Sequence, residues 1–341
     1  FCSITAHQGR IIQSRSQESI LNEVRKVAAD PEFKGIISDI GGATANMYRM
    51  RCTRPDVEAK CKRLSCVHPG ICKLLGTDHG PTIDLLRQAR AVPGVKRVFV
   101  ASGIRMDLAN RSPAYVDEMA RHHVGGHLKV APEHTSETVL AAMKKPSQAS
   151  FEEFAGRFAD ASRRAGKEQY LVPYFIAGHP GSTVKEMIEL AVFLKSSGYR
   201  PRQVQDFIPA PMDVATSMWH TGLDPFTLQP VPAAKKLRDR VAQRALMQFF
   251  KPENWFAIRQ ALNDARRGDL IGEGPQCLIP SRPPPEAVEA KRRAAQAAHP
   301  DAEEGADEPA SDATHVHAED AGTHPSVGYR PGRAGARRRP R

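Results

Sequence analysis

Short apolar runs alternate along this chain with longer segments in which apolar residues recur at helical spacing. The runs lie near residues 36, 98, 128, 172 and 205, and a polar loop with glycine or proline follows each of them. The longer segments predict helices at 16–30, 81–92, 112–123, 151–166 and 184–198. This alternation predicts an α/β fold, a parallel sheet covered by helices, closed into all or part of a barrel. An open doubly wound sheet is the alternative.

Helix ends and strand ends carry further signals. Ser16 is a candidate N-cap, and Gly166 and Gly198 lie where helices should stop. The loops that follow the five strands read SDIGGATAN, ASGIR, APEH, AGHPGST and FIPAPMD. They are rich in glycine, proline, histidine and acidic residues. Parallel barrels place their active sites at these carboxyl ends, so we expect the functional residues there.

Two segments interrupt the alternation. Residues 50–81 carry four cysteines and no strand signal, and this insert is too long for an ordinary connection between a strand and a helix. After His299, Ala, Glu, Asp, Pro and Gly dominate, a composition that cannot bury enough apolar surface to fold. We therefore predict a barrel domain at 1–225, a helical extension at 226–296 and a disordered basic tail at 297–341.

Composition and charge narrow the class of protein. The chain has 341 residues, a hydrophobic content of 40% and a net charge of +11, part of which comes from the terminal YRPGRAGARRRPR. We find no membrane-length apolar run and no signal peptide. Six cysteines in a chain of this size indicate metal ligation or chemistry in a reducing compartment, which predicts the cytoplasm and no membrane partner.

The opening FCSITAHQGRIIQSRS resembles the end of the CxxxCxxC cluster-binding loop of radical S-adenosylmethionine (SAM) enzymes. Cys2 matches the last cysteine, and Phe1 matches the aromatic residue that usually precedes it. The likeness continues through ISDIGGATANMY, ASGIR, KVAPEHT, QYLVPYFIAGHPG and QVQDFIPAP, to about residue 280. Together these segments resemble the YgiQ-type radical SAM proteins.

The resemblance implies a partial (β/α)6 barrel whose first strand and first two cluster cysteines lie upstream of Phe1. It implies that Cys2 ligates a [4Fe-4S] cluster whose free iron binds SAM, and that an electron from a flavodoxin- or ferredoxin-like donor cleaves SAM to a 5′-deoxyadenosyl radical. The chain alone would supply one of three thiolates, so we expect it to be inactive by itself.

The resemblance also assigns candidate SAM contacts. Gly41 and Gly42 match the motif near the methionine end of SAM, where Ala43 replaces the acid found in many relatives; a plain tight turn is the alternative. Lys129 and Glu133 are candidates for the ribose or carboxylate of SAM, or for a salt link at the edge of the core.

Four further residues lie at or after the ends of the fourth and fifth strands. Ile176 is the candidate for the surface beside adenine. Phe207 and Ile208 would continue that surface, although strand core is the favoured interpretation. We interpret His179 as a residue that stabilises its turn.

The four cysteines of the insert are Cys52, Cys61, Cys66 and Cys72. Their spacing is not that of a zinc knuckle, yet four thiols in one loop favour a shared ligand. An auxiliary Fe–S cluster, a structural zinc ion and unligated thiols all stay open. The neighbouring pair, Asp78 and His79, is interpreted as lying at the surface, and Cys277 as structural.

The sequence thus predicts a radical SAM enzyme of undefined substrate. Methylthio or methyl transfer to RNA or protein is one hypothesis, based on the basic charge and the AGHPG turn. The alternative is a non-enzymatic metal- or RNA-binding protein on a degenerate barrel.

Overall fold

The five predicted strands are present, and all of their pairings are parallel. The computed structural model describes residues 4–9, 11–42 and 44–297. Its strands are β1 (Ile36–Ile37), β2 (Arg97–Val98), β3 (His127–Glu133), β4 (Tyr170–Ala177) and β5 (Gln205–Asp206). Within the described residues they form two sheets, of order β1-β2 and β3-β4-β5. Closure into a barrel therefore stays a prediction.

The helices of this β-α region lie where apolar periodicity placed them. The Ser16 hydroxyl caps α2 by accepting a bond of 3.2 Å from the Ser19 amide, which confirms the predicted N-cap. Short helical turns η1 (Ala45–Met47) and η2 (Met119–His123) accompany the longer helices. The helices are α1 (Ile4–Gln8), α2 (Gln17–Ala28), α3 (Pro55–Glu58), α4 (Gly80–Arg90), α5 (Met106–Ala109), α6 (Pro113–Glu118), α7 (Glu137–Met143), α8 (Gln148–Arg164), α9 (Val184–Ser196) and α10 (Val214–Thr221).

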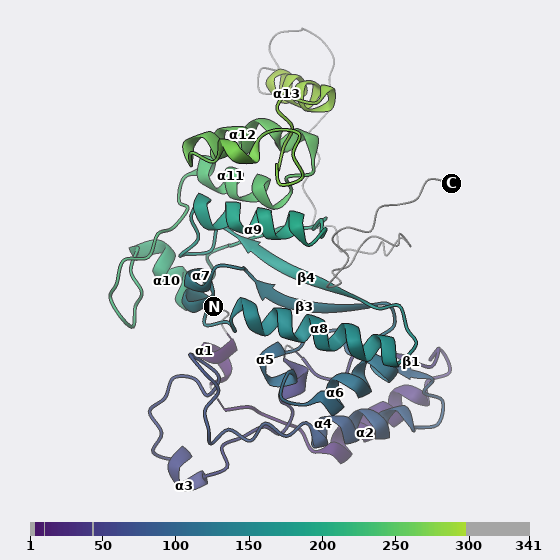
Figure 1. Ribbon diagram of the computed structural model, residues 1–341. Coiled ribbons are helices and arrows are strands. Elements are labelled where there is room, and N and C mark those ends of the chain that lie inside the picture. The colour runs from purple at the N-terminus through teal and green to yellow at the C-terminus, as the bar shows by residue number, and fades with distance from the viewer. Residues whose placement is uncertain (1–3, 10, 43, 298–341) are drawn as a thin grey trace, which may run out of the picture.

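The C-terminal helices are added in layers above β4 (Figure 1). From β4 outward, α9 is followed by α11 (Leu237–Met247), α12 (Trp255–Asp264) and α13 (Pro285–Ala297), with the short turns η3 (Pro252–Asn254) and η4 (Gly268–Leu270) between them. Of these helices, α11, α12 and α13 lie in the segment predicted as a helical extension, whereas α9 belongs to the predicted barrel domain. The predicted tail lies outside the described residues, apart from Ala297 at the end of α13. No helix in the described ranges is long and apolar enough to cross a membrane.

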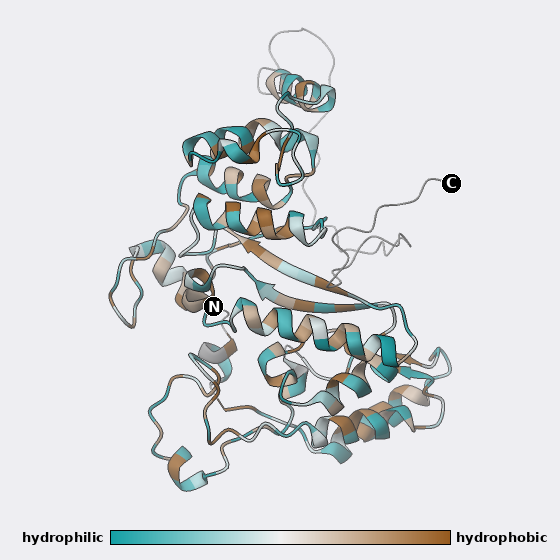
Figure 2. Cartoon of the chain, in the orientation of Figure 1, coloured by the Kyte–Doolittle hydropathy of each residue, from teal (hydrophilic) through white to brown (hydrophobic). Residues whose placement is uncertain are grey.

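One apolar core joins the sheet to helices on both of its sides. Leu128 and Val130 of β3 and Leu171 and Phe175 of β4 are buried in it, together with Phe154 of α8. Figure 2 shows apolar segments along β4 and on α9 above it. Because successive residues of a strand point to opposite faces, His127 and Lys129 lie on the other face of β3, where both are exposed.

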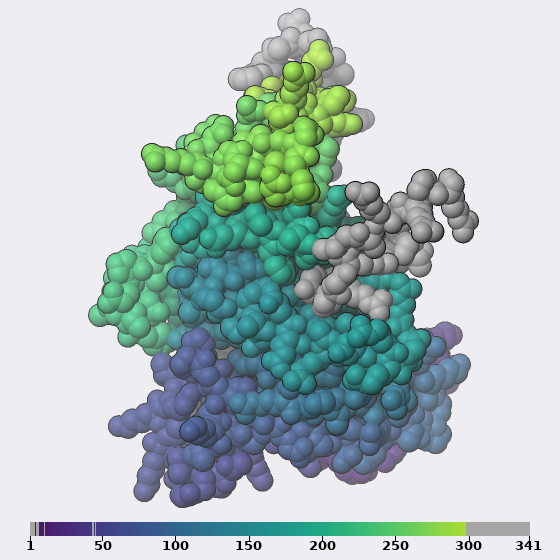
Figure 3. Space-filling model, viewed as in Figure 1, coloured from purple at the N-terminus to yellow at the C-terminus, as the bar shows by residue number. Residues whose placement is uncertain are grey.

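The cysteine-rich insert projects from this body as a lobe, at the lower left of Figures 1 and 3. It contains only α3 and an isolated antiparallel bridge between Cys52 and Leu75. A small apolar cluster of Met50, Leu75 and Leu108 anchors it, and Cys66 and Cys72 pack against that cluster. Separately from this lobe, the carboxyl end of β3 lies beside α7 in Figure 1.

Candidate active site

The carboxyl end of β3 holds a buried carboxylate on a strained backbone. Glu133 has a φ of 68°, a left-handed conformation that costs a non-glycine residue about 1–2 kcal/mol. One of its oxygens, Oε1, lies 3.2 Å from Nζ of Lys145, which also donates to the Ala131 carbonyl. The other oxygen, Oε2, is buried without a hydrogen-bond partner among the described residues. Strain of this kind clusters at ligand sites, so Glu133 stays a candidate contact.

His134 links the loop after β3 to the loop after β4. It is fully buried, and its Nδ1 accepts bonds from the Thr135 and Ser136 amides at 2.9 and 3.0 Å. The proton of the neutral ring therefore lies on Nε2, which is 3.4 Å from the Ser182 hydroxyl. Burial lowers the pKa of His134 to about 4. The His134 ring is therefore neutral near pH 7, and its contacts connect the loop after β3 to the loop after β4.

The AGHPG turn after β4 is fixed from within and from α11. Nδ1 of His179 donates to the Pro180 carbonyl at 2.7 Å, which confirms the predicted turn-stabilising role. Burial lowers the pKa of His179 to about 4. From α11, the amide of Gln243 accepts a bond from the Gly178 N–H (2.8 Å) and donates one to the Ser182 carbonyl (2.9 Å). Gly181 has a φ of 94°, a backbone conformation that residues with a side chain rarely adopt, so the turn favours glycine there.

Ile176 and Phe207, the candidates for the adenine surface, lie in one apolar cluster. Ile176 is 7% exposed and Phe207 is 9% exposed, and Val139, Met143 and Ala215 complete the cluster. The His179 ring packs edge-on against Phe207, with 5.2 Å between the centroids. Phe207 is therefore a core residue, as the favoured interpretation had it, although it follows β5 directly; a contact of adenine with Ile176 or Phe207 stays a prediction.

The loops after β1 and β2 are bonded to each other. Asp39 accepts bonds from the Ala101 amide and the Ser102 hydroxyl. Asn46, fully buried, accepts from the Arg105 amide at 2.7 Å and donates to the Arg105 carbonyl at 2.9 Å. These bonds hold the predicted GGATAN and ASGIR segments side by side.

Gly41 lies in the turn after β1 with a φ of 124°, which only glycine adopts readily, whereas Gly42 has an ordinary φ. The backbone thus accounts for Gly41 as a tight turn, and a SAM contact by either glycine stays a prediction. Phe1, Cys2 and Ala43 lie outside the described residues.

The four cysteines of the insert are partly exposed, and none of them forms a disulfide within the described residues. The Cys72 amide donates to the Cys66 carbonyl at 2.7 Å, so these two residues are neighbours. Within residues 4–9, 11–42 and 44–297, no three His, Cys, Asp or Glu side chains form a group that could hold a metal ion. A shared metal stays a prediction that would require the four thiols to move together.

Three interpretations from the sequence are corrected by the packing. His79 is not at the surface: it is 1% exposed, stacks on Tyr115 and accepts a 3.4 Å bond from the Asn46 amide. Ile208 is not strand core, because β5 ends at Asp206 and Ile208 is 76% exposed. Lys129 does not form the salt link with Glu133, whose partner is Lys145.

Other interpretations agree with the structure. Asp78 is exposed, as expected, and Cys277 is buried in the C-terminal extension with 6% exposure.

Sequence reasoning missed two residues that organise the site, Gln243 and Asn46. Both are fully or almost fully buried amides that satisfy backbone groups of a distant loop. A glutamine within an amphipathic helix looks like a surface residue in sequence. Asn46 had a weak signal, because it closes the GGATAN segment already identified as a strand end.

Comparisons with known proteins give a consistent likeness. The family described as a domain of unknown function, DUF3362, matches residues 202–339. The UPF0313 protein of Shewanella oneidensis is 51% identical over 286 residues, which cover 82% of this chain and 36% of that protein. The UPF0313 protein of Rhodopseudomonas palustris is 50% identical over 292 residues, 84% of this chain and 43% of that protein. The UPF0313 protein of Vibrio cholerae is 51% identical over 289 residues, 83% of this chain and 37% of that protein. This chain is therefore similar to UPF0313 proteins over most of its own length, and it spans well under half of theirs.

Proposed function

We propose that this chain forms part of a radical SAM enzyme of the YgiQ type. UPF0313 is the YgiQ family, so the relatives at about 50% identity support the resemblance seen in the sequence. The five parallel strands support it as well, since each carries one of the matching segments at its carboxyl end. The substrate of such an enzyme is not defined by these findings.

One observation supports the proposal: residues of three matching segments lie at neighbouring strand ends. In the proposal, adenine packs against the apolar cluster that contains Ile176 and Phe207. At the adjacent strand end, Oε2 of Glu133 is a buried acceptor without a partner in the described ranges. A ribose hydroxyl or an ammonium group of SAM would supply the matching donor.

The histidines of this site hold loops in place rather than move protons. The pKa values of His134 and His179 are lowered to about 4 by burial, so both rings are neutral near pH 7. Each ring uses Nδ1 in a bond to backbone. Their role in the proposal is to fix the loops after β3 and β4 around the bound cofactor.

The cluster itself is assigned to Cys2 and two upstream cysteines. Cys2 lies outside the described residues, and the described part of the chain gathers no group of three metal-binding side chains, so no further ligand is assigned. When bound, the cluster and SAM would supply the one-electron chemistry, while the protein supplies position and shelter from water.

Measuring SAM binding to the Glu133→Gln variant tests the site. The protein to use contains this chain and the complete cluster motif, reconstituted without oxygen, and equilibrium dialysis measures the dissociation constant of SAM. A hydrogen bond to a charged group is worth about 1.5–3 kcal/mol, so we expect SAM to bind at least about tenfold more weakly.

Glu152→Gln is the matched control, because Glu152 lies exposed on α8 and its loss should leave SAM binding unchanged. Equal affinity of the wild type and the Glu133→Gln variant would remove Glu133 from the site. Equal weakening by both variants would show a general effect of lost charge instead.

A further inference from the structure

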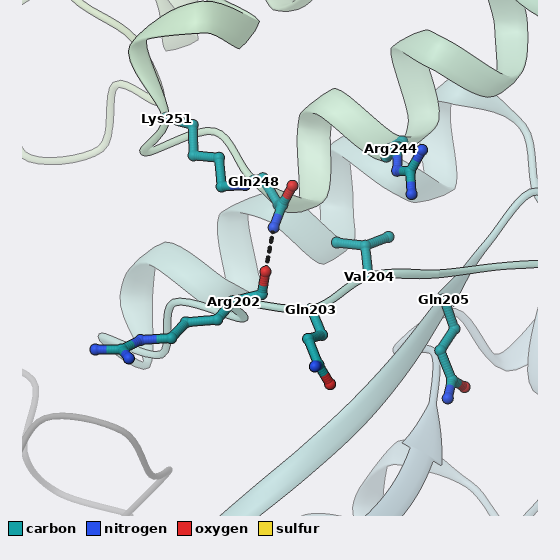
Figure 4. Close-up of a pocket in the computed structure, with 7 residues that line it drawn as sticks. All are labelled: Arg202, Gln203, Val204, Gln205, Arg244, Gln248 and Lys251. Carbon is teal, nitrogen blue, oxygen red and sulfur yellow. Dashed lines mark hydrogen bonds between the residues drawn. The ribbon is translucent and has the colours of Figure 1, made fainter. Parts of the chain in front are cut away.

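A polar cavity lies where the chain enters β5, beside the end of α11, and its lining residue Gln205 pairs with Ile176 of β4. It has a volume of about 470 Å³ and lies between the segment that enters β5 and the end of α11 (Figure 4). Its lining residues are Arg202, Gln203, Val204, Gln205, Arg244, Gln248 and Lys251. This volume falls in the range of pockets that hold small molecules, about 300–1,000 Å³.

Two segments of the chain form the walls of this cavity. Gln203 and Gln205 are two positions apart on the segment that enters β5, so they lie on the same face of it. Arg244 lies in the last turn of α11, Gln248 is the C-cap of that helix, and Lys251 lies in the turn that follows. The cavity therefore has one wall with two cations, formed by the end of α11 and the turn after it, and a second wall with two amides.

Gln248 joins the two walls. It is 8% exposed, and its amide nitrogen donates to the carbonyls of Arg202 and Pro201 at 2.7 and 3.3 Å. The first of these bonds is drawn in Figure 4. The distance between the walls is thus fixed by a buried side chain, which makes the cavity a built feature of the fold.

The charge of the cavity favours an anion. Three of its seven lining residues are cationic and none is a carboxylate. The nearest acid in sequence, Asp206, lies 3.3 Å from Arg244 in an exposed pair. Arg244 still has 57% of its side chain exposed, and such pairs are weak, so its guanidinium can bind a second partner.

The end of α11 alone does not explain this arrangement. Cations are favoured near a helix C-terminus, which accounts for Arg244 and Lys251. It does not account for Arg202, which belongs to another segment, or for Arg200 nearby, which lies 5.7 Å from the centre of the Phe250 ring. Neither does it account for the paired glutamines.

We propose that this cavity binds the phosphate group of a nucleotide. Arginine and lysine form charge-assisted bonds with phosphate oxygens, and glutamine amides both donate to and accept from sugar hydroxyls and base edges. The nucleotide comes from a single-stranded RNA or from a free nucleotide, which present the same phosphate. The site is independent of SAM chemistry, so it is testable without a cluster.

The test measures binding of a fluorescent twelve-nucleotide RNA of mixed sequence to the full 341-residue chain by anisotropy. The pocket variant combines Arg244→Gln with Lys251→Gln. The control variant combines Arg238→Gln with Arg240→Gln, which removes the same charge from exposed positions of α11 outside the cavity. Circular dichroism and thermal unfolding confirm that both variants fold.

We expect the pocket variant to bind RNA at least tenfold more weakly and the control to bind within twofold of the wild type. Losing two phosphate contacts should also reduce the slope of log K against log salt by about 1.4. Uridine monophosphate, added as a competitor, distinguishes a free nucleotide from single-stranded RNA as the ligand. If it displaces the RNA, a free nucleotide fits the cavity; if it does not, the cavity requires an RNA strand. Equal losses in both variants, or no binding of either probe by the wild type, would overturn the proposal.

Discussion

Gln243 connects the C-terminal extension to the proposed site, so replacing it tests how that site is held. Its amide oxygen accepts from the Gly178 N–H at 2.8 Å, and its amide nitrogen donates to the Ser182 carbonyl at 2.9 Å. With 1% of its surface exposed, it leaves no room for water to replace these bonds. Gln243→Ala therefore leaves one backbone donor and one backbone acceptor buried without partners.

The cost follows from those two groups. An unsatisfied buried donor or acceptor costs about 1–3 kcal/mol, so the loss of both bonds should lower the free energy of unfolding by about 2–6 kcal/mol. The loss should be local as well as global, because the AGHPG turn is what Gln243 restrains. Hydrogen exchange at the Gly178 amide should accelerate more than exchange in α2, which lies far from the turn in Figure 1.

Urea unfolding monitored by circular dichroism measures the first effect, and hydrogen exchange mass spectrometry measures the second. Gln260→Ala is the control, because Gln260 is exposed and bonds only to the Asp264 side chain at 2.7 Å. We expect the control to change stability by less than about 0.5 kcal/mol. A Gln243→Ala variant that loses less than about 1 kcal/mol, or that exchanges no faster at the turn, would refute this account of the site.

Three other predictions concern pH, the insert and metal. Burial lowers the pKa of His134 and His179 in the folded chain to about 4, below the ordinary value of 6.5. As the pH falls, the unfolded chain therefore binds protons at these histidines before the folded chain does. The free energy of unfolding should thus be highest above about pH 6.5 and fall towards pH 4, by about 1.4 kcal/mol per pH unit for each histidine. In urea titrations at a series of pH values, the His134→Gln variant should show a shallower fall with pH than the wild type. A fall as steep as that of the wild type would contradict this prediction. Arg105→Ala removes a 3.0 Å bond from the Arg105 guanidinium to the Val67 carbonyl, a bond that ties the insert to the loop after β2. Limited proteolysis should therefore cut the insert of this variant faster than that of the wild type, and equal rates of cleavage would contradict the restraint of the insert by Arg105. A metal shared by the four thiols should appear as stoichiometric zinc or iron in elemental analysis and disappear in the Cys61→Ser, Cys66→Ser double variant; metal-free protein argues for unligated thiols.

Local patterns predicted the elements of this fold because each pattern lies within one element. The five apolar runs became five strands, and Ser16 capped its helix, since periodicity and capping involve residues a few positions apart. The sequence also favoured a core position for Phe207, which is buried in one cluster with Ile176. Pairing of the strands into one barrel was beyond such reasoning, because it depends on contacts between distant segments.

The misses have the same physical cause. His79 is buried by Tyr115, a partner 36 positions further along the chain, and Gln243 acts on Gly178 across 65 positions. The ion-pair partner of Glu133 is Lys145, and the whole of α7 lies between these two residues in the chain. The interpretation of Ile208 as strand core was wrong because β5 ends two residues earlier, at Asp206, and Ile208 is exposed.

The cleavage of SAM tests the central claim most directly. The protein to assay contains this chain with the complete three-cysteine motif, reconstituted without oxygen, with iron and sulfide content confirmed before dithionite and SAM are added. We expect release of 5′-deoxyadenosine, and loss of that release when Cys2 is replaced by alanine. A fully loaded protein that releases none would contradict the enzyme proposal and favour a non-enzymatic binding protein on the same fold.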